Sequence, residues 1–436
     1  MKVYPPSLLI PPVSRACGTV VLPGSKSISN RVLLLAALSS SVCRLSGVLE
    51  AEDTERMKEA LSALGVDVRR DPSDASAYTV RGCSGRFPVR SARIFLGNAG
   101  TAMRTLCATL ALYGGDYVLD GVERMRQRPI GPLVDALRAL GADVRCLQGS
   151  GCPPVQIGPM AGIGPRCSIT GSVSSQFISA LLMAGQVYAG PRGLVIDIDG
   201  PLISKPYVEM TLRLMKRFGA EVEDRGNSFF VPGGAYRLDA PLRVEGDASG
   251  ASYFLALGAL AGGPVRVEGA GSASIQGDVE FARVLERMGA RISWGPDWIE
   301  ARAPESGKLR GIEVDCTAIP DAAMTLAAVA LKAEGPTKLT GIGSWRVKET
   351  DRIAALQTEL RRVGAKVASG EDWLTVEPPQ ALRSADVRTY GDHRIAMTMS
   401  LASCAGVPVR ILEPGCVAKT YPTYFDEFAA VTGCEF

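Results

Sequence analysis

A pattern that recurs about every 73 residues constrains this 436-residue chain more than any other feature. An amphipathic stretch ends in Gly and leads into an alternation of apolar and charged residues, as in ALSALGVDVRR, ALRALGADVRC, LMKRFGAEVED, VLERMGARISW and ELRRVGAKVAS. The glycines of these copies are Gly65, Gly141, Gly219, Gly289 and Gly364, and a degenerate sixth copy ends at Gly433. Gly just past a helix favours a left-handed C-cap, and the alternation after it is typical of a β-strand. The pattern therefore predicts six helix-then-strand units.

A second helix, rich in Ala, Leu and Met, is predicted once in each unit. These helices are expected to begin near Ser27, Asn98, Ser175, Ser249, Asp321 and His393. Sequences such as SSQFISALLMA and DAAMTLAAVAL are apolar on most faces, which is typical of helices that are buried on all sides. The predicted fold class is α/β, with six repeats of a βαβαββ-like unit.

Six such units exceed what a single hydrophobic core can hold. We expect two domains of three units each. The N-terminal domain is predicted over 22–243, and the C-terminal domain over 1–21 together with 244–436. The boundary then lies between APLRVEG and DASGASYFL, and the N-terminal strand region packs on the C-terminal domain.

Composition excludes several classes of function. A net charge of +3 and the absence of basic runs argue against nucleic acid or a membrane surface as a partner. The eleven cysteines include no C-x-x-C pair, and we expect reduced, mostly buried thiols. His393 is the single histidine, so a histidine-based metal site is not expected. Prolines interrupt the apolar stretch of MKVYPPSLLIPPVSR, so this segment is typical of neither a signal peptide nor a membrane anchor. A cytoplasmic protein is therefore expected.

Polar clusters stand at the expected start of every buried helix: 25–27, 97–101, 172–176, 246–249, 319–321 and 391–394. Helix N-termini carry free N–H groups and partial positive charge, which suit them to anions. Together they predict a cleft for an anionic ligand between the two domains. Ordinary capping explains each cluster singly, with Ser27 as an N-cap and Asp321 as a cap after Pro320. The spacing around Lys26 does not fit a nucleotide P-loop.

Nine stretches carry a resemblance to a known family: LPGSKSISNR, GNAGTAMR, RQRPIGPLVDAL, SSQFISALLM, LISKPYVEMT, DAAMT, WRVKETDRI, GDHRIAMTMSLA and AKTYPTYFDEF. In this order they resemble the 5-enolpyruvylshikimate-3-phosphate synthases, or 3-phosphoshikimate 1-carboxyvinyltransferases. The resemblance implies a two-domain inside-out α/β barrel. It also implies transfer of the carboxyvinyl group of phosphoenolpyruvate to the 5-hydroxyl of shikimate 3-phosphate, on the route to chorismate. No cofactor and no metal are implied, and a monomer is expected.

The same resemblance implies roles for individual residues. The catalytic residues would be Asp321 as base, Glu349 as proton donor to C3 and Lys26 as an assistant, with the division of proton transfers among them open. Phosphoenolpyruvate would be bound by Lys26, Asn98, Gly100, Arg128, Gln176, Arg352, Arg394 and Lys419. Shikimate 3-phosphate would be bound by Lys26, Ser27, Arg31, Ser174, Ser175, Gln176, Ser204, Tyr207, Asp321, Ser344 and Lys348. His393 is expected to line the site without acting in catalysis.

Two positions depart from the family pattern, and two other interpretations stay open. Ser344 stands where many relatives have Asn, and Thr105 where relatives usually have Pro. A UDP-N-acetylglucosamine enolpyruvyl transferase would carry a loop Cys, which GVERMRQRP lacks. A non-catalytic anion-binding relative would not need Asp321, Glu349 and Lys26. Instead of binding a ligand, any single Arg of these sets could form an ordinary ion pair, such as an i,i+3 helix pair between Glu349 and Arg352.

Overall fold

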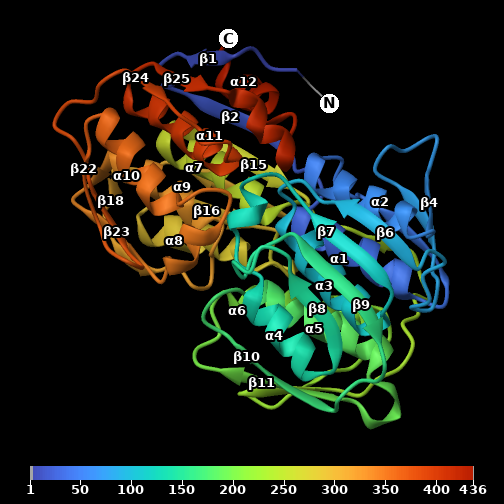
Figure 1. Cartoon of the computed structure of the whole chain (residues 1–436). Helices are drawn as coiled ribbons and strands as arrows, with labels where there is room; N and C mark the ends of the chain where they lie inside the picture. The colour runs from blue at the N-terminus through green and yellow to red at the C-terminus, as the bar shows by residue number, and fades with distance from the viewer. Residues whose placement is uncertain (1–2, 436) are drawn as a thin grey trace. The chain divides into compact units, whose positions relative to one another are not determined.

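The computed structural model describes residues 3–435, which form two compact units (Figure 1). The middle unit is Gly24–Val244, and the terminal unit is the described part of Met1–Pro23 with Glu245–Phe436. Both units are built from the same repeated element, a small sheet with one buried and one amphipathic helix. The fold is a two-domain inside-out α/β fold, as predicted.

The middle unit holds three four-stranded sheets, with strand orders β14-β3-β5-β4, β6-β7-β9-β8 and β10-β11-β13-β12. The strands are β3 (Val42–Ser46), β4 (Asp67–Arg70), β5 (Tyr78–Arg81), β6 (Ser91–Phe95), β7 (Asp116–Asp120), β8 (Ala142–Cys146), β9 (Val155–Met160), β10 (Arg166–Thr170), β11 (Leu194–Asp199), β12 (Glu223–Asp224), β13 (Ser228–Val231) and β14 (Leu242–Arg243). In each sheet the first two strands are parallel and the remaining pairs are antiparallel.

The terminal unit repeats this arrangement with sheets β16-β17-β15-β2, β19-β21-β23-β22 and β1-β25-β24, and it adds the pair β18-β20. The strands are β1 (Ser7–Ile10), β2 (Ala16–Val21), β15 (Gly262–Glu268), β16 (Arg291–Trp294), β17 (Trp298–Arg302), β18 (Leu309–Arg310), β19 (Glu313–Asp315), β20 (Ala333–Glu334), β21 (Thr337–Thr340), β22 (Lys366–Ser369), β23 (Leu374–Glu377), β24 (Ala385–Val387) and β25 (Val409–Leu412). The N-terminal strands β1 and β2 pair with β25 and β15, so they complete sheets of the terminal unit.

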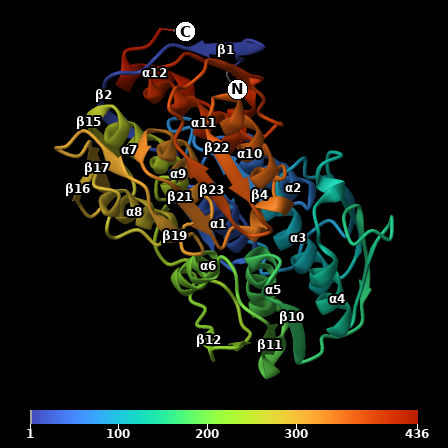
Figure 2. The ribbon, with the colours of Figure 1, turned by 90° about the vertical axis from the view of Figure 1, so that its left-hand side faces the viewer.

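Buried helices fill the inside of each unit. They are α1 (Lys26–Leu38), α3 (Gly100–Tyr113) and α5 (Ser175–Tyr188) in the middle unit, and α7 (Ala248–Leu260), α9 (Ala323–Val329) and α11 (His393–Ser400) in the terminal unit. Every residue of α7 is buried, and α7 packs on α9 and on strands β15 and β17 (Figure 2). All six helices begin within two residues of the predicted positions, because their apolar composition and polar starts mark them in the sequence.

The amphipathic helices are α2 (Glu52–Ala63), α4 (Gly131–Ala139), α6 (Lys205–Arg217), α8 (Phe281–Arg287), α10 (Arg352–Arg362) and α12 (Tyr424–Thr432). Short 3-10 turns are η1 (Met125–Gln127), η2 (Gly190–Arg192), η3 (Gly277–Glu280), η4 (Ala330–Lys332), η5 (Gly343–Val347), η6 (Leu401–Ala405) and η7 (Pro414–Lys419). The six glycines that follow the amphipathic helices all have positive φ, between +69° and +109°. The predicted left-handed C-caps are therefore confirmed.

The cysteines form no disulfide in the described chain, but only five of the eleven are fully buried, so the expectation of mostly buried thiols is wrong. The other six are partly buried and lie in strands, in loops and in the turn η7. Burial raises the pKa of the Cys107 thiol to about 12, which keeps it protonated. Between residues 3 and 435, no helix combines the length and the apolar character that a membrane span requires.

The repeated C-cap glycine generates a stability prediction. An added Cβ at Gly219 (φ +79°) would have Arg237 O at 3.7 Å as its nearest atom, whereas at Gly65 (φ +84°) it would lie 2.8 Å from Pro88 Cβ. We expect Gly219→Ala to lower the free energy of unfolding by about 1–2 kcal/mol through backbone strain alone. Gly65→Ala should lose more, because steric overlap adds to the same strain.

Urea unfolding followed by circular dichroism measures both variants. Gly162→Ala is the control, because no atom lies within 4 Å of its added Cβ. It should change the free energy of unfolding by less than about 0.5 kcal/mol. Equal losses at Gly65 and Gly219 would show that the contact with Pro88 relaxes and adds nothing.

Candidate active site

Asp321 is held at the start of α9 by a buried tryptophan. The Trp345 side chain is fully buried, and its Nε1–H donates to the carbonyl oxygen of Pro320 at 2.7 Å. The helix itself begins at Ala323 after the N-cap Ala322, which has no side-chain cap bond. The expectation that Asp321 caps this helix is therefore wrong, because its carboxylate is taken up by ion pairs.

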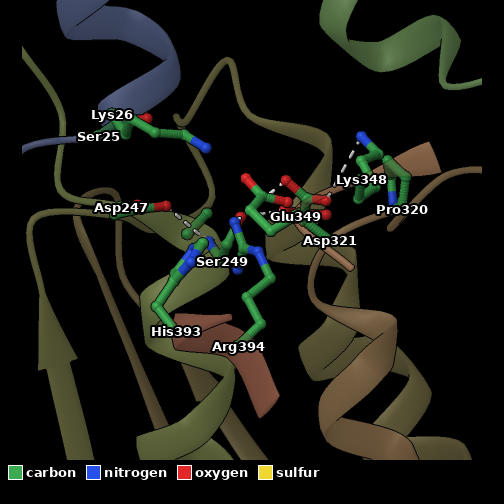
Figure 3. Close-up of polar contacts among 12 residues, drawn as sticks. Ser25, Lys26, Asp247, Ser249, Pro320, Asp321, Lys348, Glu349, His393 and Arg394 are labelled. Carbon is green, nitrogen blue, oxygen red and sulfur yellow. Dashed lines mark hydrogen bonds and ion pairs between the residues drawn. The ribbon is translucent and has the colours of Figure 1, made fainter. Parts of the chain in front are cut away.

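Asp321 is only 6% exposed, and three cations surround its carboxylate. Two of them, Lys348 and Arg394, are labelled in Figure 3. Arg352 Nη1 lies 3.3 Å from Oδ1, Arg394 Nη2 lies 3.1 Å from Oδ2, and Lys348 Nζ lies 3.9 Å from Oδ1. Charge-assisted hydrogen bonds of this kind are stronger than those between neutral groups. The carboxylate and the cations therefore hold one another in fixed positions.

Arg352 joins three buried carboxylates. Its Nε lies 2.8 Å from Asp392 Oδ2, its Nη2 lies 2.7 Å from Glu349 Oε2, and its Nη1 reaches Asp321. Burial lowers the pKa of Arg352, but the charges of Asp392, Glu349 and Asp321 outweigh this effect and raise it well above its ordinary value. The i,i+3 ion pair between Glu349 and Arg352 is present. It does not lie on a helix surface, because Glu349 precedes α10 and is buried.

The start of α11 supplies the remaining groups of this cluster. Asp392 is its N-cap and accepts a hydrogen bond from the Arg394 backbone N–H at 2.9 Å. His393 is fully buried and Arg394 is 3% exposed, with its Nη1 3.4 Å from the Tyr253 hydroxyl. Lys419 is buried at the end of η7, and Ser344 is half-buried in η5.

In the middle unit, Lys26 opens α1. The N-cap is Ser25, whose extended backbone precedes the helix and whose Oγ accepts a hydrogen bond from Ile28 N. Ser27 already lies inside the helix, so its expected role as N-cap is wrong, and the helix begins one residue earlier than Ser27. Lys26 Nζ lies 3.8 Å from Asp53 Oδ2, and both side chains are almost wholly buried.

Arg31 lies one turn further along α1, in a buried polar pocket. Its Nε donates to Thr211 Oγ at 2.7 Å and its Nη1 donates to the Ser27 carbonyl oxygen at 2.9 Å. The Tyr207 ring centre lies 6.0 Å from the Arg31 guanidinium carbon. Burial lowers the pKa of Arg31 to about 10. The guanidinium therefore stays charged at neutral pH and has no carboxylate among these partners.

Arg128 lies against the first turn of α3. Its Nη1 donates to both the backbone oxygen and Oδ1 of Asn98, each at 3.0 Å. A Cβ on Gly100 would lie 2.6 Å from Arg128 Nη2, so only Gly allows this close approach. On the facing helix α5, Gln176 Nε2 donates to Thr101 Oγ at 3.4 Å. The starts of α3 and α5 are thereby joined.

Serines occupy the starts of α5 and α6. Ser174 caps α5, where its Oγ accepts a hydrogen bond from Gln176 N at 3.2 Å, and Ser175 is buried in the first turn. Ser204 precedes α6 with φ +50°, a strained conformation for a residue other than Gly.

The six polar clusters predicted from the sequence thus lie at helix starts within each unit: α1, α3 and α5 in one, and α7, α9 and α11 in the other. The sequence reasoning missed Asp53, Thr211 and Asp392 as partners of these residues. Asp392 stood inside the quoted GDHR stretch and could have been found as an N-cap. Thr211 carried no sequence signal, because only tertiary packing brings it to Arg31.

Comparison with known proteins agrees with this geometry. Residues 10–428 match the family described as EPSP synthase (3-phosphoshikimate 1-carboxyvinyltransferase). The chain is 57% identical over 433 residues to the 3-phosphoshikimate 1-carboxyvinyltransferase of Cupriavidus taiwanensis, covering 98% of this chain and 99% of that protein. The enzyme of that name from Nitrosomonas europaea is 55% identical over 431 residues, again covering 98% and 99%.

Two solved structures show the same fold. EPSP synthase from Acinetobacter baumannii superimposes with a TM-score of 0.79 at 26% identity, covering 98% of both chains. The enolpyruvyl transferase NikO from Streptomyces tendae superimposes with a TM-score of 0.73 at 21% identity, covering 98% of this chain and 97% of that one. The second likeness is one of fold alone.

The sixfold α/β repeat of this chain is the fold that it shares with the EPSP synthase of Acinetobacter baumannii. The match over residues 10–428 and the close relatives decide the family. The chain belongs to the EPSP synthase (3-phosphoshikimate 1-carboxyvinyltransferase) family and is a transferase.

The Arg352 cluster predicts a large and pH-dependent loss of stability on its removal. Arg352→Met leaves three buried carboxylates without their shared cation, and we expect a loss of about 3–5 kcal/mol in the free energy of unfolding at pH 7. The loss should shrink at pH 5, because uncompensated carboxylates can take up protons. Arg283→Met is the control, since it removes an exposed i,i+3 pair with Glu280. Its loss should stay below about 1 kcal/mol, and an equal loss from both variants would contradict the prediction.

Proposed function

We propose that these clusters perform the reaction of the family, which transfers the carboxyvinyl group of phosphoenolpyruvate to the 5-hydroxyl of shikimate 3-phosphate in the shikimate pathway. This assignment of residues rests on the arrangement of Asp321, Arg352 and Glu349, in which one buried guanidinium contacts both carboxylates. This places two groups that can move protons close together. The remainder of the proposal concerns how each group takes part.

The reaction needs a proton acceptor at one end and a proton donor at the other. The 5-hydroxyl adds to C2 of phosphoenolpyruvate while its C3 methylene gains a proton, which gives a tetrahedral ketal phosphate. Loss of phosphate and of a methyl proton then restores the vinyl group. We assign Asp321 as the base at the hydroxyl and Glu349 as the group that gives and later removes the C3 proton. Lys26 assists from the start of α1.

Phosphoenolpyruvate carries a phosphate and a carboxylate, and it requires several fixed cations. We propose Arg352, Arg394 and Lys419 from the terminal unit, and Lys26, Asn98, Gly100, Arg128 and Gln176 from the middle unit. The Arg352 contacts use four of its five N–H donors, which leaves one for a ligand. Carboxylates of the chain contact Arg352, Arg394 and Lys26, and they hold these three cations in place before an anion binds.

For shikimate 3-phosphate, we propose that Ser174, Ser175, Ser204 and Lys348 bind the phosphate. The start of α5 supports this assignment, because free N–H groups at a helix N-terminus suit a phosphate. Ser27, Arg31 and Tyr207 would bind the carboxylate and ring, since Arg31 is charged and meets only neutral partners in its pocket. Gln176, Asp321 and Ser344 would meet the hydroxyl groups. We further propose a monomer in the cytoplasm.

The identity of the acceptor is tested by phosphate release from phosphoenolpyruvate. Release should occur with shikimate 3-phosphate and should stay at background with UDP-N-acetylglucosamine. Release with the sugar nucleotide alone would overturn the proposal in favour of the related transferase. Release with neither acceptor would indicate a non-catalytic anion-binding protein.

The acid and base roles predict large losses of turnover. Asp321→Ala and Glu349→Gln should each lower kcat by about 10²–10⁴-fold, with a smaller effect on substrate affinity, because these groups act at the reacting atoms. Steady-state kinetics measures this effect. Glu313→Gln is the control, because Glu313 is an exposed carboxylate of β19. A kcat within threefold of the wild type would remove the assigned role from that residue.

Thr105 predicts weak inhibition by glyphosate, an inhibitor of this family. Thr105 is buried in α3, and its Oγ donates to the Thr101 carbonyl oxygen at 2.9 Å. Pro at this position would remove both that bond and the backbone N–H, and would shift the first turn around Gly100. We therefore expect Thr105→Pro to tighten glyphosate inhibition by about 3–30-fold, with near-normal affinity for phosphoenolpyruvate.

A matched variant separates the backbone effect from the side-chain effect. Thr105→Val keeps the backbone N–H and loses only the hydroxyl bond, so its inhibition constant should stay close to that of the wild type. If Thr105→Pro leaves the inhibition constant unchanged, or tightens phosphoenolpyruvate binding equally, a shift of the α3 first turn does not explain the difference.

A further inference from the structure

Glu359 is a fully buried carboxylate on α10 that none of the assigned roles uses. It lies seven residues after Arg352, so both side chains leave the same buried face of the helix. Its Oε2 accepts a hydrogen bond from the Arg388 backbone N–H at 3.2 Å, and its Oε1 accepts one from the Tyr390 hydroxyl at 2.6 Å. Arg362 Nε lies 3.3 Å from the same Oε1 and partly balances its charge. Glu359 therefore holds the chain just before α11.

The segment that Glu359 holds contains a strained turn at 389–392. Tyr390 and Gly391 both have positive φ, of +56° and +65°. The backbone N–H of Asp392 donates to the Thr389 carbonyl oxygen at 2.9 Å and closes the turn. Two positive φ values inside such a hydrogen bond are the pattern of a type I′ turn, whose first central position favours Gly, Asn or Asp. A tyrosine there persists only where the surrounding structure holds it.

The Tyr390 side chain supplies a contact that holds the turn. Tyr390 is 40% exposed, so burial of its ring gives only part of the attachment. Burial first, and then the hydrogen bond and charge of Glu359, raise the pKa of Tyr390 to about 12, so its hydroxyl stays a donor at neutral pH. A carboxylate accepts on both oxygens, whereas a glutamine would turn an NH2 group toward one of the two donors. The acidic residue therefore suits the two donors that converge on it.

The turn leads directly into the charged cluster of the candidate active site. Asp392 is the last residue of the turn and the N-cap of α11, and its Oδ2 lies 2.8 Å from Arg352 Nε. The backbone N–H of Arg394 donates to Asp392 Oδ1 at 2.9 Å. Helix α10 therefore contacts this segment at two points, through Arg352 at its start and through Glu359 two turns later. A change in the turn would move Asp392, and with it the groups that Asp392 fixes.

We propose that Glu359 is a positioning residue for phosphoenolpyruvate binding, which holds the turn through Tyr390. The turn fixes Asp392 and thereby the guanidinium groups of Arg352 and Arg394. The inference rests on the proposed role of these two arginines in binding phosphoenolpyruvate. Cations that are fixed in advance bind an anion without the cost of ordering their side chains. Glu359 is assigned no contact with substrate and acts only through other residues.

The test is Tyr390→Phe, which removes only the hydroxyl. At saturating shikimate 3-phosphate, we expect KM for phosphoenolpyruvate to rise about 5- to 30-fold, because substrate and transition state lose the same binding contacts. The values of kcat and of KM for shikimate 3-phosphate should stay within threefold of the wild type. A merely structural role would lower the fraction of folded enzyme, and so the apparent kcat, without changing KM. An unchanged KM for phosphoenolpyruvate would overturn the inference.

A second variant separates strain in the turn from loss of the hydroxyl. Tyr390→Asn also lacks the phenol hydroxyl, but asparagine adopts a positive φ much more readily than phenylalanine does. Its turn should persist without the bond to Glu359, so KM for phosphoenolpyruvate should stay within threefold of the wild type. A rise as large as that in Tyr390→Phe would overturn the inference, because the conformation of the turn would then not be what the bond preserves.

A double variant shows whether Glu359 acts through Tyr390. Glu359→Gln alone should raise KM for phosphoenolpyruvate at least as much as Tyr390→Phe does. Combined with Tyr390→Phe, it should add less than twofold to the larger single effect, because both changes break one contact. A combined effect equal to the product of the two would overturn the inference.

Tyr113→Phe is the control. It removes a hydroxyl bond of 3.0 Å to the Phe87 carbonyl oxygen, at the end of α3 opposite to Gly100. KM for phosphoenolpyruvate should stay within twofold of the wild type in this variant. A rise like that in Tyr390→Phe would overturn the assignment of the effect to the turn.

Arg394→Lys distinguishes failure of the inference from failure of the binding role. Lysine keeps the charge but loses the planar fork of the guanidinium, so KM for phosphoenolpyruvate should rise at least tenfold. If Arg394→Lys raises KM and Tyr390→Phe does not, the binding role stands and the inference fails. If neither variant changes KM, the binding role of Arg394 fails, and the inference fails with it. If only Tyr390→Phe raises KM, the turn acts on other groups, which overturns the inference as well.

Discussion

The rest of the structure depends on helices that are buried on every side. A helix that is buried on every side has no solvent-exposed face, and the N–H groups of its first turn have no partner within the helix. The sheets then cover the helices from outside, in the reverse of the usual arrangement. The first-turn N–H groups need partners, and serines and aspartates provide them at Ser25, Ser174, Asp247 and Asp392. The burial of these helices therefore forms the core of each unit and also concentrates polar groups at the helix starts.

Charge balance then decides what those helix starts can do. In the terminal unit the cations Arg352, Arg394 and Lys348 contact carboxylates of the chain itself, so the two buried guanidinium groups, those of Arg352 and Arg394, are both paired. Such pairs contribute little net stability, because desolvation offsets their attraction. Their benefit is geometric, since they fix long side chains in advance of ligand binding. In the middle unit Arg31 is instead fixed by neutral oxygens, which leaves its charge for an anion.

The sequence by itself determined the repeat, the six buried helices, the glycine C-caps and the family, because each depends on local periodicity or on contiguous motifs. Tertiary structure alone decided the partners of the site residues. Nothing local places Thr211 against Arg31, since this contact joins segments far apart in the chain. The same holds at Asp321 and Ser27, where the sequence suggested helix caps. Cap geometry depends on where a helix actually begins, and in both cases the packing around the helix start set that point.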